Sequence, residues 1–489
     1  MSTRMPSADT AWLHMDRPTN LMVINSISLF DAPADWERHE AVIQRRLVDR
    51  YPRFRQRVVE SRLPLRPPRW EDDPEFALEH HVHRITLPPP GDVATLQELV
   101  GDVMTMPLDR DRPLWQIFLV DGVGEGAATI TRVHHCIADG VALARVMLSL
   151  TDSRPDGGIE PLEPETAEDP PGGLLGGLVG QGARLVEGAA QAAATVGRQG
   201  LHVATSPAHA ASLAGAVARD GATALKLLLT PADAATALKG DPGISRRVSW
   251  TSPIPLSDIK RIAHANDATV NDVVLAAVSG ALRHYLQERQ SPVAEIQALV
   301  PFNLRPLDEP VPRALGNKFG LVFLPLPVGT SGSYRRLMQV HERMRELKEG
   351  REGPVSYGLL SVTGMAPERV ERKVVDLLTG KGTAVMTNVP GPRETVYLAG
   401  APIRSALFWA PTSGHIGMSV SIFSYRGEVT VGLMVDAALV PDPGEIVLLF
   451  EWEIEALGRL HRPRPGRRTS AGRRAEQARS GAGNGTARQ

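Results

Sequence analysis

The 489-residue chain has little cysteine, few aromatic residues and almost no net charge. Its single cysteine, Cys136, excludes an intramolecular disulfide framework and a metal site with several cysteine ligands, and is typical of a reducing, cytoplasmic compartment. With 54 basic and 55 acidic residues, the chain has no overall field that would attract nucleic acid or an anionic membrane. Aromatic residues make up only 5%, but hydrophobic residues reach 42%, which is ample for a core and excludes global disorder.

The chain also lacks an apolar run suited to a signal peptide or a membrane span. The residues before Asp16 contain no apolar stretch. Gln199–Ala218 and Ser405–Tyr425 are uncharged, but polar residues, glycine or proline interrupt both, whereas a spanning helix needs about 20 predominantly apolar residues. We therefore predict no membrane-spanning helix.

Shifts in composition divide the chain into two lobes, a connector and a tail. Residues 1–152 are predicted to form an N-terminal lobe and residues 244–461 a C-terminal lobe. Between them, residues 153–243 begin as an acidic linker and continue as an Ala/Gly-rich segment, in which we expect only weak helices because each glycine costs about 1 kcal/mol relative to alanine. The tail, residues 462–489, has eight arginines and one acidic residue and is predicted to be disordered.

Both lobes mix strand and helix periodicity, which predicts a mixed α/β class. Ala127–Val133 is typical of a strand, and Val141–Leu150 of a helix. One face of that helix is predicted to carry Val141, Ala144, Met147 and Leu148. In the second lobe, Val270–Leu286 is predicted to be a buried helix that a capping box of Thr269 and Asp272 opens. Further predicted elements are the helix Ser333–Lys348 and the strands Phe319–Pro325, Ser419–Phe423 and Glu428–Val435.

The most informative motif is His134-His135-Cys136-Ile137-Ala138-Asp139-Gly140, between the predicted strand and helix. In chains of this composition, a match of this kind arises by chance on the order of a few times in a thousand. One interpretation is a turn whose histidines belong to the core or surface. The other is catalytic, because a neutral imidazole with a pKa near 6.5 accepts a hydroxyl proton at neutral pH. Asp139, in a tight turn, more often holds a loop than completes a triad, and no Gly-x-Ser-x-Gly elbow indicates a serine nucleophile.

Other motifs follow in a fixed order along the chain. They are Pro113–Trp115, Val270–Val274, Asn388–Pro392, and Ser424–Gly427 with Gly432–Asp436. Together with the motif around His135 they resemble those of the bacterial wax ester synthase/diacylglycerol acyltransferases, which belong to the CoA-dependent acyltransferases related to chloramphenicol acetyltransferase and to condensation domains. The resemblance covers about residues 5–460 except the connector. It implies two chloramphenicol acetyltransferase-like lobes with the active site in a channel between them, and no metal or cofactor.

The resemblance also implies roles for individual residues. His135 would be the general base that deprotonates the acceptor hydroxyl. His134 would support it or merely pack beside it. Asp139 would orient the loop by pairing with an arginine of the second lobe, for which Arg305 is the candidate unless it is an ordinary surface residue. Gly140 would permit a tight turn and close approach of the substrate.

Asn271, in the first turn of the buried helix, would stabilise the oxyanion near the positive helix end. The alternative is a polar residue that bonds to its own helix backbone. Pro113–Trp115 and Asn388–Pro392 are predicted to be structural turns near the interface, and Cys136 a bystander.

Weaker patterns have structural interpretations. His80–His83 is predicted to be strand surface, because a third metal ligand is not evident. Gly122–Gly126 is predicted to be a hairpin turn, because it lacks the spacing of a dinucleotide loop. His415 either lines the site or is structural.

The function predicted is transfer of a long acyl chain from acyl-CoA to diacylglycerol or a fatty alcohol. Because such substrates are amphiphiles, we expect a cytoplasmic protein associated peripherally with the inner face of the membrane or with lipid inclusions, and no nucleic-acid partner. Two alternatives stay open: the same scaffold acting on short-chain or polyketide-type substrates, and a non-catalytic protein that binds lipid inclusions.

Overall fold

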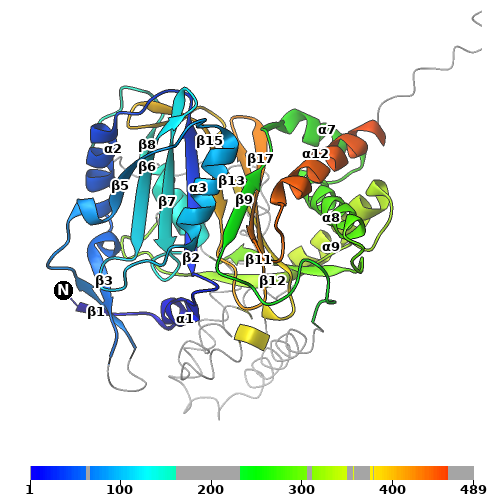
Figure 1. The fold of residues 1–489 in the computed structure, drawn as a ribbon, viewed down its shortest axis with the longest axis horizontal. Helices are drawn as coiled ribbons and strands as arrows, with labels where there is room; N and C mark the ends of the chain where they lie inside the picture. The colour runs from blue at the N-terminus through cyan, green and yellow to red at the C-terminus, as the bar shows by residue number, and fades with distance from the viewer. Residues whose placement is uncertain are drawn as a thin grey trace, which may run out of the picture.

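The computed structural model describes residues 2–61, 67–160, 232–304, 311–349, 356, 375–377 and 379–460. Most of the predicted connector (161–231), the predicted tail and Arg305 therefore lie outside the described residues. The described chain forms two seven-stranded sheets side by side, each with helices packed against it (Figure 1). This is the two-lobed, mixed α/β fold expected from the sequence.

The sheet of the N-terminal lobe has seven strands. Four of the described α-helices belong to the same lobe. In spatial order its strands are β5 (Val82–Thr86), β6 (Trp115–Val123), β7 (Gly126–His134), β2 (Val23–Phe30), β15 (Ala401–Trp409), β14 (Tyr397–Leu398) and β8 (Thr151–Asp152). The helices are α1 (Ser7–Met15), α2 (Trp36–Val42), α3 (Val93–Thr105) and α4 (Gly140–Leu148). A separate small sheet comprises β1 (Ser2–Arg4), β4 (Arg69–Asp72) and β3 (Gln56–Val59).

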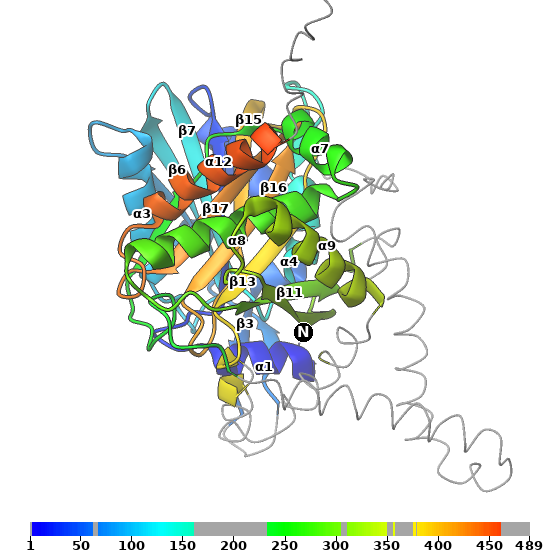
Figure 2. The same cartoon turned by 90° about the vertical axis from the view of Figure 1, so that its right-hand side faces the viewer.

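The sheet of the C-terminal lobe is covered by helices on one face (Figure 2). Its strands are β10 (Ile254–Pro255), β17 (Glu428–Asp436), β16 (Met418–Tyr425), β13 (Ala384–Pro390), β11 (Ile296–Asn303) and β12 (Phe319–Leu326), with β9 (Arg246–Trp250) also paired to β17. The helices are α7 (Leu256–Ala265), α8 (Val270–Glu288), α9 (Ser333–Glu349) and α12 (Pro443–Leu460).

Helix α8 forms where the sequence predicts a buried helix. Thr269 caps it, and its hydroxyl accepts from the backbone N–H of Asp272 while the Asp272 carboxylate accepts from the backbone N–H of Thr269. Because apolar side chains surround the helix, it packs against both α9 and α12 within the core of the C-terminal lobe. The predicted strands β12, β16 and β17 are confirmed, and the hairpin between the last two turns at Arg426 and Gly427, both with positive φ.

Two strands from the C-terminal half of the sequence complete the N-terminal sheet. Strand β15 pairs antiparallel with β2, so that Trp409 lies opposite Asn25, and β14 pairs with β8. The lobes are therefore joined by shared strands as well as by side-chain contacts. The predicted division by position did not include this exchange, because strand pairing partners distant in sequence leave no periodic signal.

Of the four residues predicted to share a face of α4, only Ala144 is fully buried. The buried residues are Ala142, Leu143, Ala144 and Val146, whereas Val141, Met147 and Leu148 are only half-buried. Met147 and Leu148 line a pocket instead of filling the core. The glycine segment between β6 and β7 is the predicted hairpin turn, with Gly124 at φ +57°.

Candidate active site

The motif around His135 forms a buried loop between β7 and α4. The backbone N–H of His135 donates to the carbonyl of Met22 (2.7 Å). Asp139 caps α4, since one carboxylate oxygen accepts from the N–H of Ala142 (2.8 Å). Its other oxygen accepts from the N–H of Lys318 in the second lobe (3.1 Å). Asp139 therefore ties the loop to both α4 and the opposite lobe, which suits the predicted orienting role, and its predicted partner Arg305 lies outside the described residues.

Asn317 fixes the orientation and tautomer of His135. The side-chain amide nitrogen of Asn317 donates to Asp9 Oδ1 and to the backbone carbonyl of His135, both at 2.8 Å. Because both of these partners are acceptors, the amide oxygen is the atom 2.9 Å from His135 Nδ1. Nδ1 must then carry the proton, which leaves the lone pair of the neutral ring on Nε2. His135 thus presents Nε2 as a proton acceptor.

Aromatic side chains enclose His135. Trp12 stacks on its ring with centroids 4.0 Å apart and an interplanar angle of 16°, and Phe319 lies 5.3 Å away. The side chain is only 4% exposed, and this burial lowers the pKa of His135 to about 3. The imidazole is therefore uncharged at neutral pH and able to accept a proton.

Asp9 lies behind Asn317 and is itself buried. Its Oδ1 also accepts from the backbone N–H of Asn317 (2.9 Å). Burial raises the pKa of Asp9 to about 6, although the hydrogen bonds from Asn317 oppose the rise. Above that pH the carboxylate of Asp9 is therefore ionised, and the side chain of Asn317 lies between it and His135. Sequence reasoning missed Asp9, Trp12 and Asn317, although all three lie within residues 5–460, the stretch that the family resemblance covers.

His134 has the tautomer opposite to that of His135. Its Nδ1 accepts from the backbone N–H of Cys136 (3.1 Å), so its proton is on Nε2, which lies 3.9 Å from Asp16 Oδ2. This geometry suits the predicted supporting role. Cys136 is buried, and burial raises the pKa of its thiol well above the usual value.

Gly140 does not occupy a turn that requires glycine. It begins α4, its φ is not in the left-handed region, and a Cβ at this position would have no atom within 4 Å. The predicted tight-turn role is therefore wrong. The open space beside this exposed residue leaves room for the other predicted role, the close approach of a substrate.

The structure brings Asn271 together with Asn388 rather than with the His135 loop. The side-chain nitrogen of Asn388, on β13, donates to the side-chain oxygen of Asn271. Within the described residues, no hydrogen bond joins Asn271 to residues 134–140. The helix start is satisfied by Thr269 and Asp272, so Asn271 does not serve its own backbone. Its amide nitrogen is the group left to donate.

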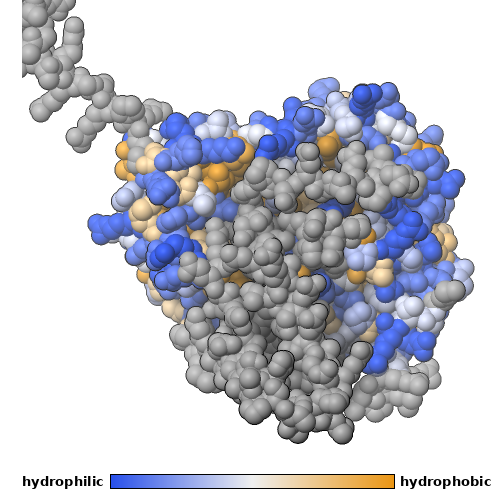
Figure 3. Space-filling view, turned by 180° about the vertical axis from the view of Figure 1, so that it is seen from behind, coloured by the Kyte–Doolittle hydropathy of each residue, from blue (hydrophilic) through white to orange (hydrophobic). Residues whose placement is uncertain are grey.

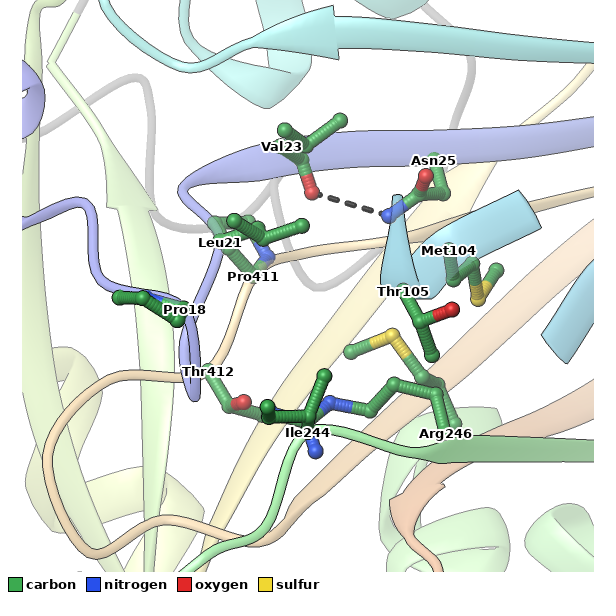
Figure 4. A pocket seen from close by; sticks show the side chains of 11 residues that line it. Pro18, Leu21, Val23, Asn25, Met104, Thr105, Ile244, Arg246, Pro411 and Thr412 are labelled. Carbon is green, nitrogen blue, oxygen red and sulfur yellow. Dashed lines mark hydrogen bonds between the residues drawn. The ribbon is translucent and has the colours of Figure 1, made fainter. Parts of the chain in front are cut away.

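Among the described residues, two of the pockets lie near the lobe junction. The smaller one lies where α3, β9 and the loop after β15 meet the start of β2 (Figure 4). There the amide nitrogen of Asn25 donates to the carbonyl of Val23 (3.0 Å), and Arg246 forms an ion pair with Asp436. Because that arginine is already paired, this pocket is poorly suited to an anion. The larger pocket lies on the other face of β2 and contacts α4.

The remaining candidate residues have structural surroundings. His81 stacks between Phe76 and Trp115, and Trp115 is buried at the start of β6. In the described part of the chain no cluster of three metal-ligating side chains occurs. His415 is exposed, with Nδ1 3.3 Å from Asp241.

None of the described helices combines the length and the apolar character needed to cross a bilayer. Hydrophilic side chains also predominate on the coloured part of the surface seen in Figure 3.

Two lobes that share strands, with a buried histidine at their junction, agree with the acyltransferase architecture that the sequence resemblance implies. Residues 5–274 match the family model of the wax ester synthase/diacylglycerol acyltransferase catalytic domain, and residues 315–458 match that of the WS/DGAT C-terminal domain. A probable diacylglycerol O-acyltransferase of Mycobacterium tuberculosis is 31% identical, over 91% of this chain and 92% of the relative. The chain therefore belongs to the wax ester synthase/diacylglycerol acyltransferase family.

Solved structures share the fold. The wax ester synthase/diacylglycerol acyltransferase from Marinobacter aquaeolei VT8 is 22% identical with a TM-score of 0.65, covering 93% of this chain and 98% of that one. The first condensation domain of the calcium-dependent antibiotic synthetase is 18% identical with a TM-score of 0.57, covering 94% and 96%. These similarities establish the two-lobed architecture of the present chain.

Proposed function

We propose that this acyltransferase transfers a long-chain acyl group from acyl-CoA to the hydroxyl of diacylglycerol or of a fatty alcohol, with His135 as general base. The observation that carries the role of His135 is its contact with Asn317, because that contact leaves Nε2 of an uncharged ring as the proton acceptor. Membership of the family supports the choice of substrates. Acyl-CoA is a substrate here, and the reaction needs no cofactor or metal.

The reaction proceeds in one transfer without a covalent enzyme intermediate. Nε2 of His135 takes the hydroxyl proton while the hydroxyl oxygen attacks the thioester carbon. The tetrahedral intermediate then breaks its carbon–sulfur bond, and the CoA sulfur leaves with the proton that His135 returns. The ester is released, and the imidazole is again neutral. Cys136 takes no part, because a buried thiol with a raised pKa is a poor nucleophile.

Asn271 serves as the donor to the oxyanion. Its side-chain oxygen is occupied by Asn388, which leaves its nitrogen, at the N-terminal end of α8, as the group that donates to a substrate oxygen bound there. A donor of this kind contributes about 3–4 kcal/mol to the transition state. Asp139 and His134 are positioning residues, and Arg305 stays the proposed partner of Asp139.

The protein reaches its lipid substrates from the cytoplasmic side of a membrane or inclusion surface. Leu448 and Trp452 support this location, because they lie one turn apart on α12 and are 66% and 48% exposed. The arginine-rich tail follows that helix directly. Co-flotation with anionic vesicles tests the proposal. If the unmodified protein and the Trp452→Ala variant both stay at the bottom of the gradient, the proposed location is contradicted.

Acyl transfer is tested with purified protein, palmitoyl-CoA, and either dioleoylglycerol or hexadecanol. We expect triacylglycerol or wax ester together with free CoA. Acylation of short-chain acceptors alone would favour the second enzyme alternative, and ester formation that persists unchanged in His135→Ala would remove His135 from the mechanism.

A further inference from the structure

The loop Asp16–Met22 joins α1 to β2 and ends beside His135. The carbonyl of Met22, the last residue of the loop, accepts from the backbone N–H of His135 (2.7 Å). The next residue, Val23, lies opposite His134 in the pairing of β2 with β7. Because Met22 is 0% exposed, this hydrogen bond is shielded from water. The end of the loop therefore holds the backbone of the residue that carries the proposed base.

The side chain of Asp16 sets the position of Met22. Asp16 lies at the C-terminal end of α1, and its Oδ1 accepts from the backbone N–H of Met22 (2.7 Å). A hydrogen bond to an ionised acceptor is about twice as strong as one between neutral groups. Two short hydrogen bonds in series therefore lead from the carboxylate of Asp16, through the backbone of Met22, to the backbone of His135.

Donors face both oxygens of Asp16. Oδ2 accepts from the guanidinium of Arg110 (2.9 Å) and lies 3.9 Å from Nε2 of His134, the nitrogen that carries the proton. Burial alone would raise the pKa of Asp16, but the contacts with His134, Met22 and Arg110 outweigh burial and hold that pKa below its usual value. The side chain is therefore ionised at neutral pH. A carboxylate accepts with both oxygens, whereas an asparagine amide would turn its NH2 group toward one of these donors.

The C-terminal half of the chain holds the middle of the loop. The guanidinium of Arg246, on β9, donates to the backbone carbonyl of Thr19, and Arg17 forms an ion pair with Asp376 (3.1 Å). Within the loop, the backbones of Arg17 and Asn20 exchange two hydrogen bonds of 2.9 and 3.1 Å. The loop is therefore fixed at both ends and in the middle. Because it has little freedom to absorb a change at Asp16, such a change is transmitted to Met22.

We propose that Asp16 is a positioning residue for acyl transfer, because it fixes the backbone of His135 through the carbonyl of Met22. Asn317 orients the ring of His135, and Asp16 holds the chain that carries the ring. In this role Asp16 touches neither the substrates nor the reacting atoms, and it exchanges no proton. The inference rests on the proposed function of His135 as general base, since the position of that residue matters for turnover only if its ring takes the hydroxyl proton.

Asp16→Asn tests the proposal because it keeps the size of the side chain and changes its charge and hydrogen bonding. The new amide must turn its nitrogen toward Met22 or toward Arg110, both of which donate. A displacement of about 1 Å costs about 100-fold in rate, so we expect kcat for CoA release from palmitoyl-CoA and hexadecanol to fall about 100-fold. KM for palmitoyl-CoA should stay within about threefold, because Asp16 contributes nothing to ground-state binding.

Asp233→Asn is the matched control. Asp233 is also half-buried, and it also accepts from a backbone N–H, that of Gln297 (2.9 Å), and from a side chain, the hydroxyl of Thr383 (2.7 Å). Neither partner belongs to the His135 loop, so this variant should keep the kcat of the unmodified protein. Unaltered kcat in Asp16→Asn, equal losses in the two variants, or a change confined to KM would each overturn the proposal.

Hydrogen–deuterium exchange at the backbone amide of His135 follows the same contact without turnover. Misalignment of Met22 should speed this exchange about tenfold or more in Asp16→Asn, and should leave it unchanged in Asp233→Asn. Equal exchange in both variants and the unmodified protein refutes the positioning role. Inactivity of the unmodified protein contradicts the proposed function only, because the exchange comparison still decides the role of Asp16.

Arg110→Ala decides the question if Asp16→Asn does not fold. The arginine side chain is 48% exposed, so its removal leaves no cavity in the core, but Oδ2 of Asp16 loses its donor. We expect kcat to fall about two- to fivefold, as for the loss of an exposed ion pair, with KM unchanged. A kcat equal to that of the unmodified protein would then reject the proposal.

Discussion

Removal of the Asn317 side chain tests whether the tautomer of His135 matters for turnover. In Asn317→Ala, Nδ1 of His135 loses its acceptor and both ring tautomers become accessible. The imidazole ring of His135, which loses this hydrogen bond, becomes positively charged during the reaction. A hydrogen bond to a charged group contributes about 1.5–3 kcal/mol, so we expect kcat to fall about 10- to 150-fold. Because Asn317 is not proposed to contact substrate, KM should change little.

Asn317→Asp separates positioning from mere packing. A carboxylate at this position still accepts from Nδ1, and its charge raises the pKa of His135. Protonation of the base should therefore limit activity at higher pH than in the unmodified protein, where burial keeps that pKa near 3. The assay is steady-state release of CoA from palmitoyl-CoA between pH 5 and 9.

Asn266→Ala, which removes a half-buried amide at the end of α7, is the control for general loss of stability. Unaltered kcat in Asn317→Ala, or equal losses in Asn317→Ala and Asn266→Ala, would refute the reasoning. A change confined to KM would also contradict it, since uniform binding and not proton transfer would then have been lost.

Three further expectations concern the histidines and Asn271. His135→Ala should abolish ester formation, whereas His134→Ala should retain measurable activity, because only the former presents a free Nε2 acceptor; equal losses in the same CoA-release assay would argue against this distinction. Asn271→Ala should lower kcat about 100-fold or more while palmitoyl-CoA binding, followed by calorimetry, stays within a few fold; the reverse pattern would assign Asn271 to binding. His39→Gln should make the protein less sensitive to acid. The folded pKa of His39 is depressed to about 4, so the unfolded chain binds more protons below pH 6.5 and stability falls as the pH is lowered toward 4. At pH 5 the depressed pKa of His39 lowers the free energy of unfolding by about 2 kcal/mol. Denaturant unfolding at pH 5 and pH 7.5 should therefore show a smaller difference in the free energy of unfolding between the two pH values for His39→Gln than for the unmodified protein.

Elements with strong local patterns could be predicted from the sequence. The capping box at Thr269 and the all-round apolar character of the following helix are local features, and α8 forms where they predict it. For α4, periodicity predicts which side chains share a face, but it cannot distinguish a side chain that fills the core from one that lines a pocket, as Met147 does. The strand β15 could not be assigned to its sheet, because its partner β2 is more than 370 residues away in the chain.

The same limit applied to the candidate site. His135 and Asp139 could be identified because they share one short motif. Asp9 and Asn317 are 308 positions apart and meet only after the two lobes assemble. Neither residue type is unusual, and neither belongs to a spacing that metals, phosphates or nucleophiles require. The contact that fixes the tautomer of His135 is therefore a product of tertiary structure.

Burial of His135 has opposite effects on the two halves of the proposed reaction. It keeps the ring neutral and thus available as a base, but it also makes the imidazolium costly while the proton is held. A costly imidazolium gives its proton readily to the departing sulfur, so burial favours breakdown of the intermediate and disfavours its formation. Asn317 opposes this cost, because the hydrogen bond that its amide oxygen accepts from Nδ1 favours the charged ring. The amide nitrogen of Asn317 donates in turn to Asp9, which holds Asn317 in this orientation. Because an amide oxygen does not take the proton from the ring, that proton is left for the leaving group.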